Sequence, residues 1–531
     1  MRVLIRVDGG GSLGVGHVMR SLALAEAAVA AGHDVVVAGH FEGSFVQGQL
    51  AAAPVEVVPL PAPAQAPRPG GGPDLFLELI QRLGPDVLHV DSYEWQGWPM
   101  GSMVPRAMIL SNLEDGTFGR RPADVVIDPT LGAEHWPRPD DGSTMTHLAP
   151  LLLRGSRYVP IRQRVLDARR VVKPIGTIAR SVLVVMGGTD PVGLAPAAVR
   201  LLARTGLPLD VTVIAVGAPA DRARIAAAGS RVSLDVRPPV DDLPVLMARQ
   251  HLVVSAAGTS VWELCALGVP MGVVWAVDNQ RAGYERVVAA GAALGLGGPE
   301  LGGGGLDEGW QGDGAGAGLL RNALTDARVR LGLSVAARKI VDGFGAWRVV
   351  RTWEQAVRQS QQQASVPDRP SATALVARPV TLDDARLLWE WRNDSDTRAG
   401  SRHADLVPWL KHLAWVGSSL ARADRMLLVV EDEAGPVGTV RWDLEPGRET
   451  EGEWEVSITV APRRRGQSLA RPLLRAAEVA RSSGTEVTAY LAVVHVDNHA
   501  SVRLFETSGY VPDLPPDPRG FMRFRKAAPV A

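Results

Sequence analysis

Short β-branched runs alternate with helical patterns along most of the chain, and this alternation constrains the fold more than any other feature. The first series of runs lies at residues 3–7, 34–38, 87–91, 107–110 and 125–127. The second series lies at residues 181–186, 210–215, 232–236, 252–255 and 271–274. Because strands that alternate with helices form parallel sheets covered by helices, the sequence predicts two consecutive α/β lobes with a cleft between them.

The two predicted lobes span residues 1–155 and 156–363. Residues 59–73 are rich in proline, alanine and glycine, so we expect a surface loop there. Glycine dominates residues 297–318, which we expect to form a flexible surface insertion in the second lobe. The residues that follow this lobe are polar and contain proline, and we predict a linker at 364–372.

After the linker the pattern changes, and residues 373–526 predict a domain of the α+β class. A first strand and a helix at 382–391 are followed by antiparallel-type strands at 427–431, 437–444 and 453–460. The expected order continues with a helix at 469–482, a strand at 487–494, a helix at 500–508 and a strand at 521–525.

Composition excludes several functional classes. The formal net charge of -1 leaves no large field to attract nucleic acid or an acidic membrane as the main partner. The single cysteine, Cys265, rules out an internal disulfide framework and a cysteine-based zinc site. The apolar start at 3–7 is interrupted by Arg6 and is read as a strand, and no run of about 18 apolar residues occurs. We therefore expect a cytoplasmic protein without membrane insertion, whose oligomeric state the sequence leaves open.

The first strand is followed by the glycine-rich stretch 14–20, which opens a helix rich in alanine and leucine at 21–26. Such a turn places backbone N–H groups and the positive end of a helix dipole next to a bound group. His17 stands in this turn and can exchange a proton near neutral pH, which makes it a candidate general base. The alternative is a histidine that only caps the helix.

Three further polar or glycine-rich stretches lie at expected strand ends, where ligands bind in open α/β sheets. They contain the candidate substrate-binding residues Asp91, Tyr93, Gly188, Thr189, Gly258, Thr259, Ser260, Glu263, Asn279 and Gln280, to which Gly16 and Arg20 are added from the first turn. Small residues at 255–260 let backbone N–H groups approach a phosphate, and Glu263 can accept hydrogen bonds from a ribose. Each stretch can also be explained as a tight turn or a solvated helix residue.

The motifs at 6–8, 14–20, 186–190, 255–263, 278–280 and 341–348 together resemble the PseG-like UDP-sugar hydrolases of pseudaminic acid biosynthesis. That family is similar in fold to the two-lobed glycosyltransferases of the GT-B type. Over roughly residues 1–350, the resemblance implies that Gly188, Thr189, the 258–260 backbone and Glu263 hold UDP. It also implies that His17 and Asp8 face the anomeric carbon, and that His17 activates water without a metal. Gly9-Gly10 and Ser92 depart from the family pattern, so a different sugar, or transfer to an acceptor, stays open.

The third domain has a strand, a basic glycine turn and a helix start at 460–470, followed by a second motif at 494–510. Both resemble the GNAT acetyltransferases, and the segment 388–394 resembles the PseH-like subgroup that acetylates nucleotide-linked amino sugars. The resemblance implies that acetyl-CoA is bound by Arg463, Arg465, Gly466, Gln467, Ser468 and Asn498. Glu455 is the candidate base. Ser468 replaces the usual glycine or alanine, and Phe505 replaces a tyrosine that acts as general acid in many relatives, so the acid is unassigned. Trp389 and Trp391 are candidates for stacking on the substrate or for the core.

Together the resemblances predict a bifunctional enzyme. It would N-acetylate a UDP-4-amino-dideoxy sugar with acetyl-CoA and then hydrolyse the UDP-2,4-diacetamido-2,4,6-trideoxyhexose to free sugar and UDP. A first alternative is a GT-B glycosyltransferase that uses a UDP-sugar, with the GNAT domain modifying its product. A second is a catalytically silent nucleotide-sugar-binding protein whose GNAT-like domain is a ligand sensor.

Overall fold

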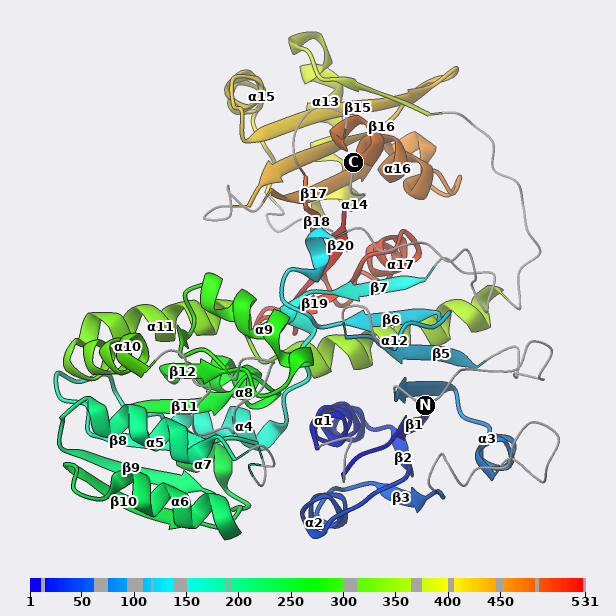
Figure 1. The fold of residues 1–531 in the computed structure, drawn as a ribbon. Helices are drawn as coiled ribbons and strands as arrows, with labels where there is room; N and C mark the ends of the chain where they lie inside the picture. Colours follow the sequence, from blue (N-terminus) through cyan, green and yellow to red (C-terminus); the bar gives the residue numbers. More distant parts are fainter. Residues whose placement is uncertain are drawn as a thin grey trace. The chain divides into compact units, whose positions relative to one another are not determined.

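The computed structural model describes residues 1–10, 15–61, 75–92, 108–115, 119–136, 150–187, 190, 193–298, 313–363, 375–399, 405–445, 452–482 and 487–528. The chain divides into two compact units, Met1–Val357 and Arg358–Ala531. The first unit contains two parallel sheets and the second contains one mixed sheet (Figure 1).

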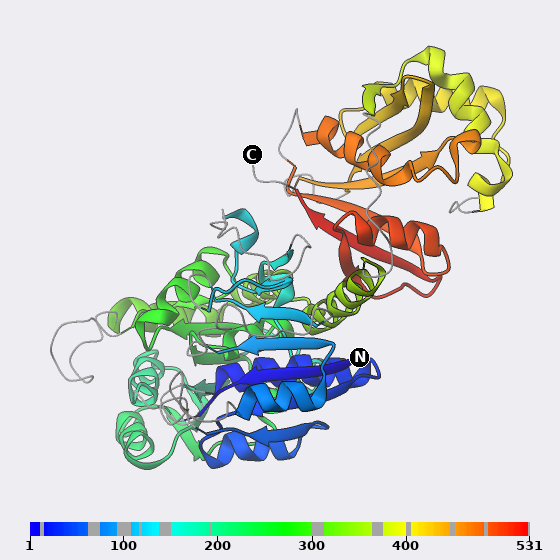
Figure 2. The ribbon, with the colours of Figure 1, turned by 90° about the vertical axis from the view of Figure 1, so that its right-hand side faces the viewer.

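The first sheet of unit 1 is parallel throughout and has the order β3-β2-β1-β4-β5-β6-β7. Its strands are β1 (Arg2–Val7), β2 (Asp34–Gly39), β3 (Glu56–Pro59), β4 (Val87–Asp91), β5 (Ile109–Leu113), β6 (Val125–Asp128) and β7 (Leu151–Arg154). Helices α1 (Gly16–Ala30), α2 (Ser44–Ala51) and α3 (Leu75–Leu83) connect them. Figure 2 shows these strands side by side, from the blue β1 to the cyan β7. The strand order reverses direction between β1 and β4, and their carboxyl ends flank the crevice where ligands bind in such sheets.

The second sheet repeats this plan in the order β10-β9-β8-β11-β12-β13. Its strands are β8 (Ser181–Val185), β9 (Leu209–Ile214), β10 (Val232–Arg237), β11 (Leu252–Ala256), β12 (Met271–Val274) and β13 (Leu294–Gly295). Its helices are α4 (Gln163–Ala168), α5 (Ala195–Arg204), α6 (Gly217–Ala227), α7 (Leu243–Ala248), α8 (Ser260–Leu267), α9 (Asp278–Ala289), α10 (Asp313–Thr325) and α11 (Ala327–Ile340). Alternate residues of β8 enter two cores, with Val182 and Val184 in one and Leu183 and Val185 in the other. Helices cover both faces of the sheet, and its strand order reverses between β8 and β11.

Helix α12 (Gly345–Gln363) follows the second lobe, but its side chains pack on the first. The indole of Trp353 is fully buried and donates a hydrogen bond of 2.8 Å to Ser111 on β5. Ser111 also lies 3.0 Å from Nδ1 of the buried His89 on β4. Glu354 contacts His33, with 2.9 Å between Oε1 and Nε2. The chain therefore returns to the first lobe before it enters unit 2, and α12 continues past the division between the units.

His89 gives unit 1 a defined sensitivity to acid. Burial lowers the pKa of His89 from 6.5 to about 4, because the charged imidazolium loses its hydration. The unfolded chain therefore binds one proton more than the folded chain between these two values. Stability is fully present above about pH 6.5 and falls by about 3 kcal/mol as the pH drops to about 4.

As the pH falls from about 6.5 to about 4, we expect the protection of the β4 and β5 amides, measured as hydrogen exchange relative to the intrinsic rate at each pH, to decrease in the parent chain and to decrease less steeply in His89→Gln. His251 in the second lobe also has a pKa lowered to about 4 by burial and acts with the same sign. The comparison is therefore made between His89→Gln and the parent, both of which retain His251. An identical pH dependence of exchange in the two chains would show that His89 does not carry the effect.

Unit 2 contains a sheet of order β14-β15-β16-β17-β18-β20-β19, in which β17 and β18 are parallel and the other neighbours are antiparallel. Its strands are β14 (Val376–Pro379), β15 (Arg425–Asp432), β16 (Gly435–Leu444), β17 (Glu453–Val460), β18 (Ala489–His495), β19 (Val511–Leu514) and β20 (Phe521–Ala527). Its helices are α13 (Ala385–Asn393), α14 (Ser395–Ala399), α15 (Trp409–Leu420), α16 (Ala470–Ser482) and α17 (His499–Thr507). The predicted fold class, two Rossmann-like lobes followed by an α+β domain, is confirmed.

Several elements differ from the sequence prediction. The strand expected at 107–110 is observed as β5 at Ile109–Leu113, and the short strands β3, β7, β13 and β19 and the helix α15 were not expected. The expected loop at 59–73 begins with the last residue of β3, and residues 62–74 lie outside the described part. The expected insertion at 297–318 already contains the start of α10, where Gly316 lies against Leu201 and Leu296. This end of the expected insertion is therefore helical, whereas residues 299–312 lie outside the described part.

Candidate functional site

The reversal point of the first sheet gathers the histidine turn and two carboxylates. Asp8 follows β1, Asp91 ends β4, and His17 lies in the first turn of α1. Nδ1 of His17 is 2.7 Å from Oδ1 of Asp91. Arg20 approaches both oxygens of Asp91, with Nε 2.6 Å from Oδ2 and a terminal nitrogen 2.6 Å from Oδ1. These three residues, predicted separately from two motifs, therefore form one cluster, in which Asp91 is buried and His17 and Arg20 are half-buried.

The cluster defines which nitrogen of His17 is basic. Burial alone would raise the pKa of Asp91, but the charge of Arg20 and the contact with His17 hold that pKa well below its usual range. An ionised oxygen at 2.7 Å requires a proton on Nδ1, because two lone pairs would repel each other. Nε2 is then the basic nitrogen of His17.

Asp8 is engaged differently. Its carboxylate accepts hydrogen bonds from Oγ of Ser92 at 3.1 Å and from the backbone N–H of His40 at 2.8 Å. A guanidinium nitrogen of Arg6 lies 2.9 Å from it. Asp8 is only 4% exposed. With these donors around it, the carboxylate is suited to holding Ser92 and the strand ends in place.

In the second sheet the strand order reverses between β8 and β11, and the start of α8 after β11 lies next to the start of α1 in the first lobe. Thr259 is the N-cap of α8, and Gly258 and Ser260 flank it. A Cβ on Gly16, the first residue of α1, would lie 2.9 Å from Cγ2 of Thr259. The amino-terminal ends of α1 and α8 therefore converge from the two lobes. The first backbone N–H groups of a helix have no acceptor within the helix, and together with the positive end of the helix dipole they favour an anion such as a diphosphate.

Glu263 lies one turn further along α8. It is partly buried, and burial raises the pKa of its carboxyl group, whereas the nearby charges of Arg164 and Arg162 lower it. Arg162 also reaches across to the first lobe, where it donates hydrogen bonds to Glu26 on α1 at 2.9 Å and to Gln49 on α2 at 2.8 Å. This charged cluster connects the two lobes beside the helix starts.

The remaining predicted residues of the second lobe lie around the same turn or outside the described part. Gln280 accepts a hydrogen bond from the backbone N–H of Ala276 at 2.9 Å, and its Nε2 would be 3.6 Å from a Cβ on Gly258. Asn279 is exposed in the first turn of α9. Asp190 caps α5 through the N–H groups of residues 194 and 195. Tyr93, Gly188 and Thr189 lie outside the described residues.

Sequence reasoning did not find an arginine contact between the lobes. The guanidinium of Arg286 on α9 lies 4.1 Å from the ring centre of Trp136 in the first lobe. Burial lowers the pKa of Arg286, while the nearby carboxylates of Asp128 and Asp115 raise it. Asp115 is also 3.5 Å from Arg20. No motif surrounds these residues, so only the fold brings them together.

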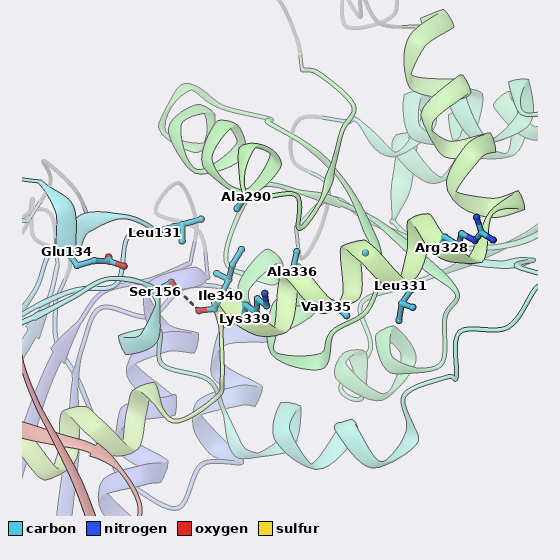
Figure 3. A pocket seen from close by; sticks show the side chains of 11 residues that line it. Leu131, Glu134, Ser156, Ala290, Arg328, Leu331, Val335, Ala336, Lys339 and Ile340 are labelled. Carbon is cyan, nitrogen blue, oxygen red and sulfur yellow. Dashed lines mark hydrogen bonds between the residues drawn. The ribbon is translucent and has the colours of Figure 1, made fainter. Parts of the chain in front are cut away.

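A groove of about 720 Å³ runs along α11 and reaches the first lobe at Leu131 and Glu134 (Figure 3). Its walls are largely apolar, and Leu331 and Val335 are 54% and 49% exposed. None of the predicted site residues is among those lining the groove in the described part of the chain. The described site residues of unit 1 therefore lie away from this groove.

In unit 2, two arginines of the basic turn are bound to other parts of the domain. Arg464 pairs with Asp432 at 2.5 Å. Arg465 pairs with Asp394 at 2.7 Å and donates a hydrogen bond to Thr397 at 2.6 Å. These contacts anchor the turn to β15 and α14, so Arg465 can position the loop as well as contact a ligand. Arg463 and Gln467 are exposed.

The backbone of this turn is left-handed at Gly466, with φ of 75°, and at Ser468, with φ of 57°. The sequence drew attention to the bulk of serine, but the conformation is the stronger constraint. A non-glycine residue in this region costs roughly 1–2 kcal/mol. Glycine at 468 removes that cost, whereas a β-branched residue increases it.

We expect Ser468→Gly to raise the free energy of unfolding of unit 2 by about 0.5–1 kcal/mol, and Ser468→Val to lower it and weaken acetyl-CoA binding. Thermal unfolding and the KM for acetyl-CoA measure the two effects. Ser457→Gly in the extended strand β17 is the matched control and should destabilise. Equal stability of the glycine and valine variants at 468 would contradict the strain argument.

The parallel pairing of β17 and β18 ends at Val456 and Ala492, although both strands continue. The strands therefore stop pairing there, and Glu455 lies one residue before that point. Asn498 caps α17 by accepting from the N–H of Ser501 at 3.1 Å.

The three aromatic candidates, Phe505, Trp389 and Trp391, pack within the domain. Phe505 is 3% exposed and packs edge-on against Tyr510, with 5.0 Å between ring centres. Trp391 is buried in the core under α13, and Trp389 donates a hydrogen bond of 2.7 Å to the carbonyl of Val407. Burial raises the pKa of Tyr510, whose hydroxyl donates to Glu478 at 2.9 Å. None of these contacts supplies a general acid.

Within the described residues, no group of three or more histidine, cysteine, aspartate or glutamate side chains is arranged so that it could hold a metal. The helices in that part of the chain include none that is both long and apolar enough to cross a membrane.

Residues 374–511 match the model of the acetyltransferase (GNAT) domain, which confirms the predicted GNAT domain. A curated relative, the UDP-N-acetylglucosamine–N-acetylmuramyl-(pentapeptide) pyrophosphoryl-undecaprenol N-acetylglucosamine transferase of Chromobacterium violaceum, is 40% identical over 124 residues. That match covers 22% of this chain, and the chain spans only 33% of the relative.

Two solved structures are similar. MurG of Acinetobacter baumannii covers 67% of this chain and 99% of its own at 16% identity, with a TM-score of 0.46. The spermidine N-acetyltransferase of Vibrio cholerae, in complex with CoA and spermine, covers 29% of this chain and 96% of its own at 18% identity, with a TM-score of 0.27.

Proposed function

We propose that unit 1 cleaves a UDP-sugar at its anomeric carbon and that His17 is the general base. The observation that carries this proposal is the position of the His17–Asp91 pair beside the converging starts of α1 and α8. A base next to a diphosphate site can remove the proton of an attacking hydroxyl, while the helix ends stabilise the UDP that leaves. The two-lobed plan with equivalent reversal points suits a GT-B enzyme, in which one lobe holds the nucleotide and the other faces the sugar.

In this proposal the second lobe holds UDP through the N–H groups of Gly258, Thr259 and Ser260, with Glu263 on the ribose. Unit 2 transfers an acetyl group from acetyl-CoA to an amine of the sugar, with Glu455 as base beside the point where β17 and β18 stop pairing. The turn at 463–468 holds the pyrophosphate of acetyl-CoA. The substrate we propose is a UDP-4-amino-dideoxy sugar, acetylated first and then hydrolysed to free sugar and UDP.

Transfer to an acceptor is the second candidate, and the 124-residue similarity to an N-acetylglucosamine transferase favours it. The proton chemistry at His17 is the same for water and for a sugar hydroxyl. The departures at Gly9, Gly10 and Ser92 concern the part of the site that would face the sugar or acceptor.

A panel of UDP-amino sugars, with and without acetyl-CoA, tests these proposals by mass spectrometry of the products. Acetyl-CoA-dependent release of UDP and free sugar supports consecutive acetylation and hydrolysis. Release that requires an added sugar acceptor supports transfer. Binding of both ligands without turnover supports the silent binding protein and contradicts both enzymatic proposals.

A further inference from the structure

Arg20 makes the most extensive contacts in the cluster around His17. Because it lies three residues after His17 on α1, both side chains leave the helix on the same face. Its guanidinium forms a two-pronged contact with Asp91, at 2.6 Å to each oxygen. A further terminal nitrogen lies 3.5 Å from Asp115. The side chain of Arg20 is 13% exposed and that of Asp91 is 1% exposed, so solvent screens this pair weakly.

The geometry resolves an apparent conflict at Nδ1 of His17. This nitrogen is 2.7 Å from Oδ1 of Asp91 and 2.9 Å from a terminal nitrogen of Arg20. Both nitrogens donate to the same oxygen, which brings them close together without a hydrogen bond between them. The positive charge of Arg20 is therefore held next to the imidazole ring.

A neutral imidazole can carry its single proton on either ring nitrogen, and only the form with Nδ1–H leaves Nε2 free to act as a base. Among the described residues, the charged or titratable groups that interact with Asp91 or Arg20 also include His89 on β4, Arg121 and Asp115. Arg20 touches both members of the pair. Its fork holds Asp91 in the orientation that accepts Nδ1–H.

Resting on the UDP-sugar cleavage proposed above, we propose that Arg20 is a positioning residue that, by holding Asp91, keeps the proton of His17 on Nδ1 and leaves Nε2 as the base. Arg20 then acts through Asp91 and His17, and it need not touch the sugar or the diphosphate. This role differs from the substrate-binding role expected from the sequence.

Nitrogen NMR of the histidine-labelled full chain tests the inference without any substrate. The signals of His17 are identified by their loss in His17→Gln. In alkaline buffer we expect the ring of His17 to carry its proton on Nδ1 in the parent chain, Arg20→Met to increase the Nε2–H fraction severalfold, and Arg20→Lys, which keeps a cation but loses the two-pronged contact, to increase it less. Arg224→Met removes an exposed arginine of the second lobe and is the matched control. An unchanged Nε2–H fraction in Arg20→Met overturns the inference.

The kinetics of UDP release supply the second readout. In Arg20→Met kcat should fall by roughly tenfold or more while the KM for the UDP-sugar changes little, because the base is misplaced and the groups that bind the substrate remain. A residue that binds the substrate would raise KM instead, and that result also overturns the inference. If the NMR change occurs but the parent chain releases no UDP from any substrate, the proposed function fails while the role of Arg20 stands.

Discussion

Replacing His17 with alanine is expected to reduce UDP release by roughly 10²- to 10⁴-fold while acetyl transfer by unit 2 continues at the parent rate. The reason is that Nδ1 of His17 is bound to Asp91, so its Nε2 is the proposed acceptor of the proton from the attacking hydroxyl. UDP release and CoA release are measured on the same sample, which separates the two reactions. Because the groups belong to different compact units, loss of one activity need not impair the other.

Two further variants make the interpretation specific. His17→Gln can still donate a hydrogen bond to Asp91 but cannot take up a proton, so it should lose as much UDP release as alanine does. His135→Ala removes an exposed histidine of the same lobe and should retain activity. UDP release within tenfold of the parent rate in His17→Gln would show that His17 orients the site and that another group removes the proton.

The strand ends of the site are well predicted from the sequence, because buried strands and glycine turns have local signatures. The β1–α1 turn with His17 and the β11–α8 turn with Thr259 both carry the residue pattern of ligand-facing turns. Their convergence across the two lobes could be expected only from the family resemblance, since no local pattern specifies which turns of two sheets meet.

Contacts made by long side chains could not be predicted in this way. Asp91 and Arg20 were both expected to bind substrate, yet each is engaged by the other, because the fold brings them together across a sequence separation of 71. The left-handed backbone of Ser468 is likewise a property of the folded turn, and serine rarely adopts this conformation. No sequence motif indicated a role for Trp353, although its hydrogen bond to Ser111 holds α12 on the first lobe.

Gly16→Ala is expected to reduce kcat/KM for UDP release by roughly 10²-fold without destabilising the protein. The new Cβ would lie 2.9 Å from Cγ2 of Thr259, closer than van der Waals contact allows, so the Thr259 side chain or the starts of α1 and α8 would have to shift. Gly16 is the first residue of α1, where alanine is as compatible with the helix as glycine. A loss of activity at undiminished thermal stability would therefore report the spacing of the two helix starts.

A double-mutant cycle with Thr259→Ser identifies the clash as the cause. Serine lacks Cγ2, and the hydroxyl oxygen of Thr259 would be 3.6 Å from the new Cβ, an ordinary contact distance. We expect Gly16→Ala combined with Thr259→Ser to recover most of the lost kcat/KM after the effect of Thr259→Ser alone is subtracted. Gly48→Ala introduces the same change in α2, where nothing lies within 4 Å, and controls for the loss of glycine. A diphosphate bound by both helix starts requires them to keep the short distance that glycine at position 16 permits. Additive effects of the two substitutions would therefore show that the helix starts do not form a common site.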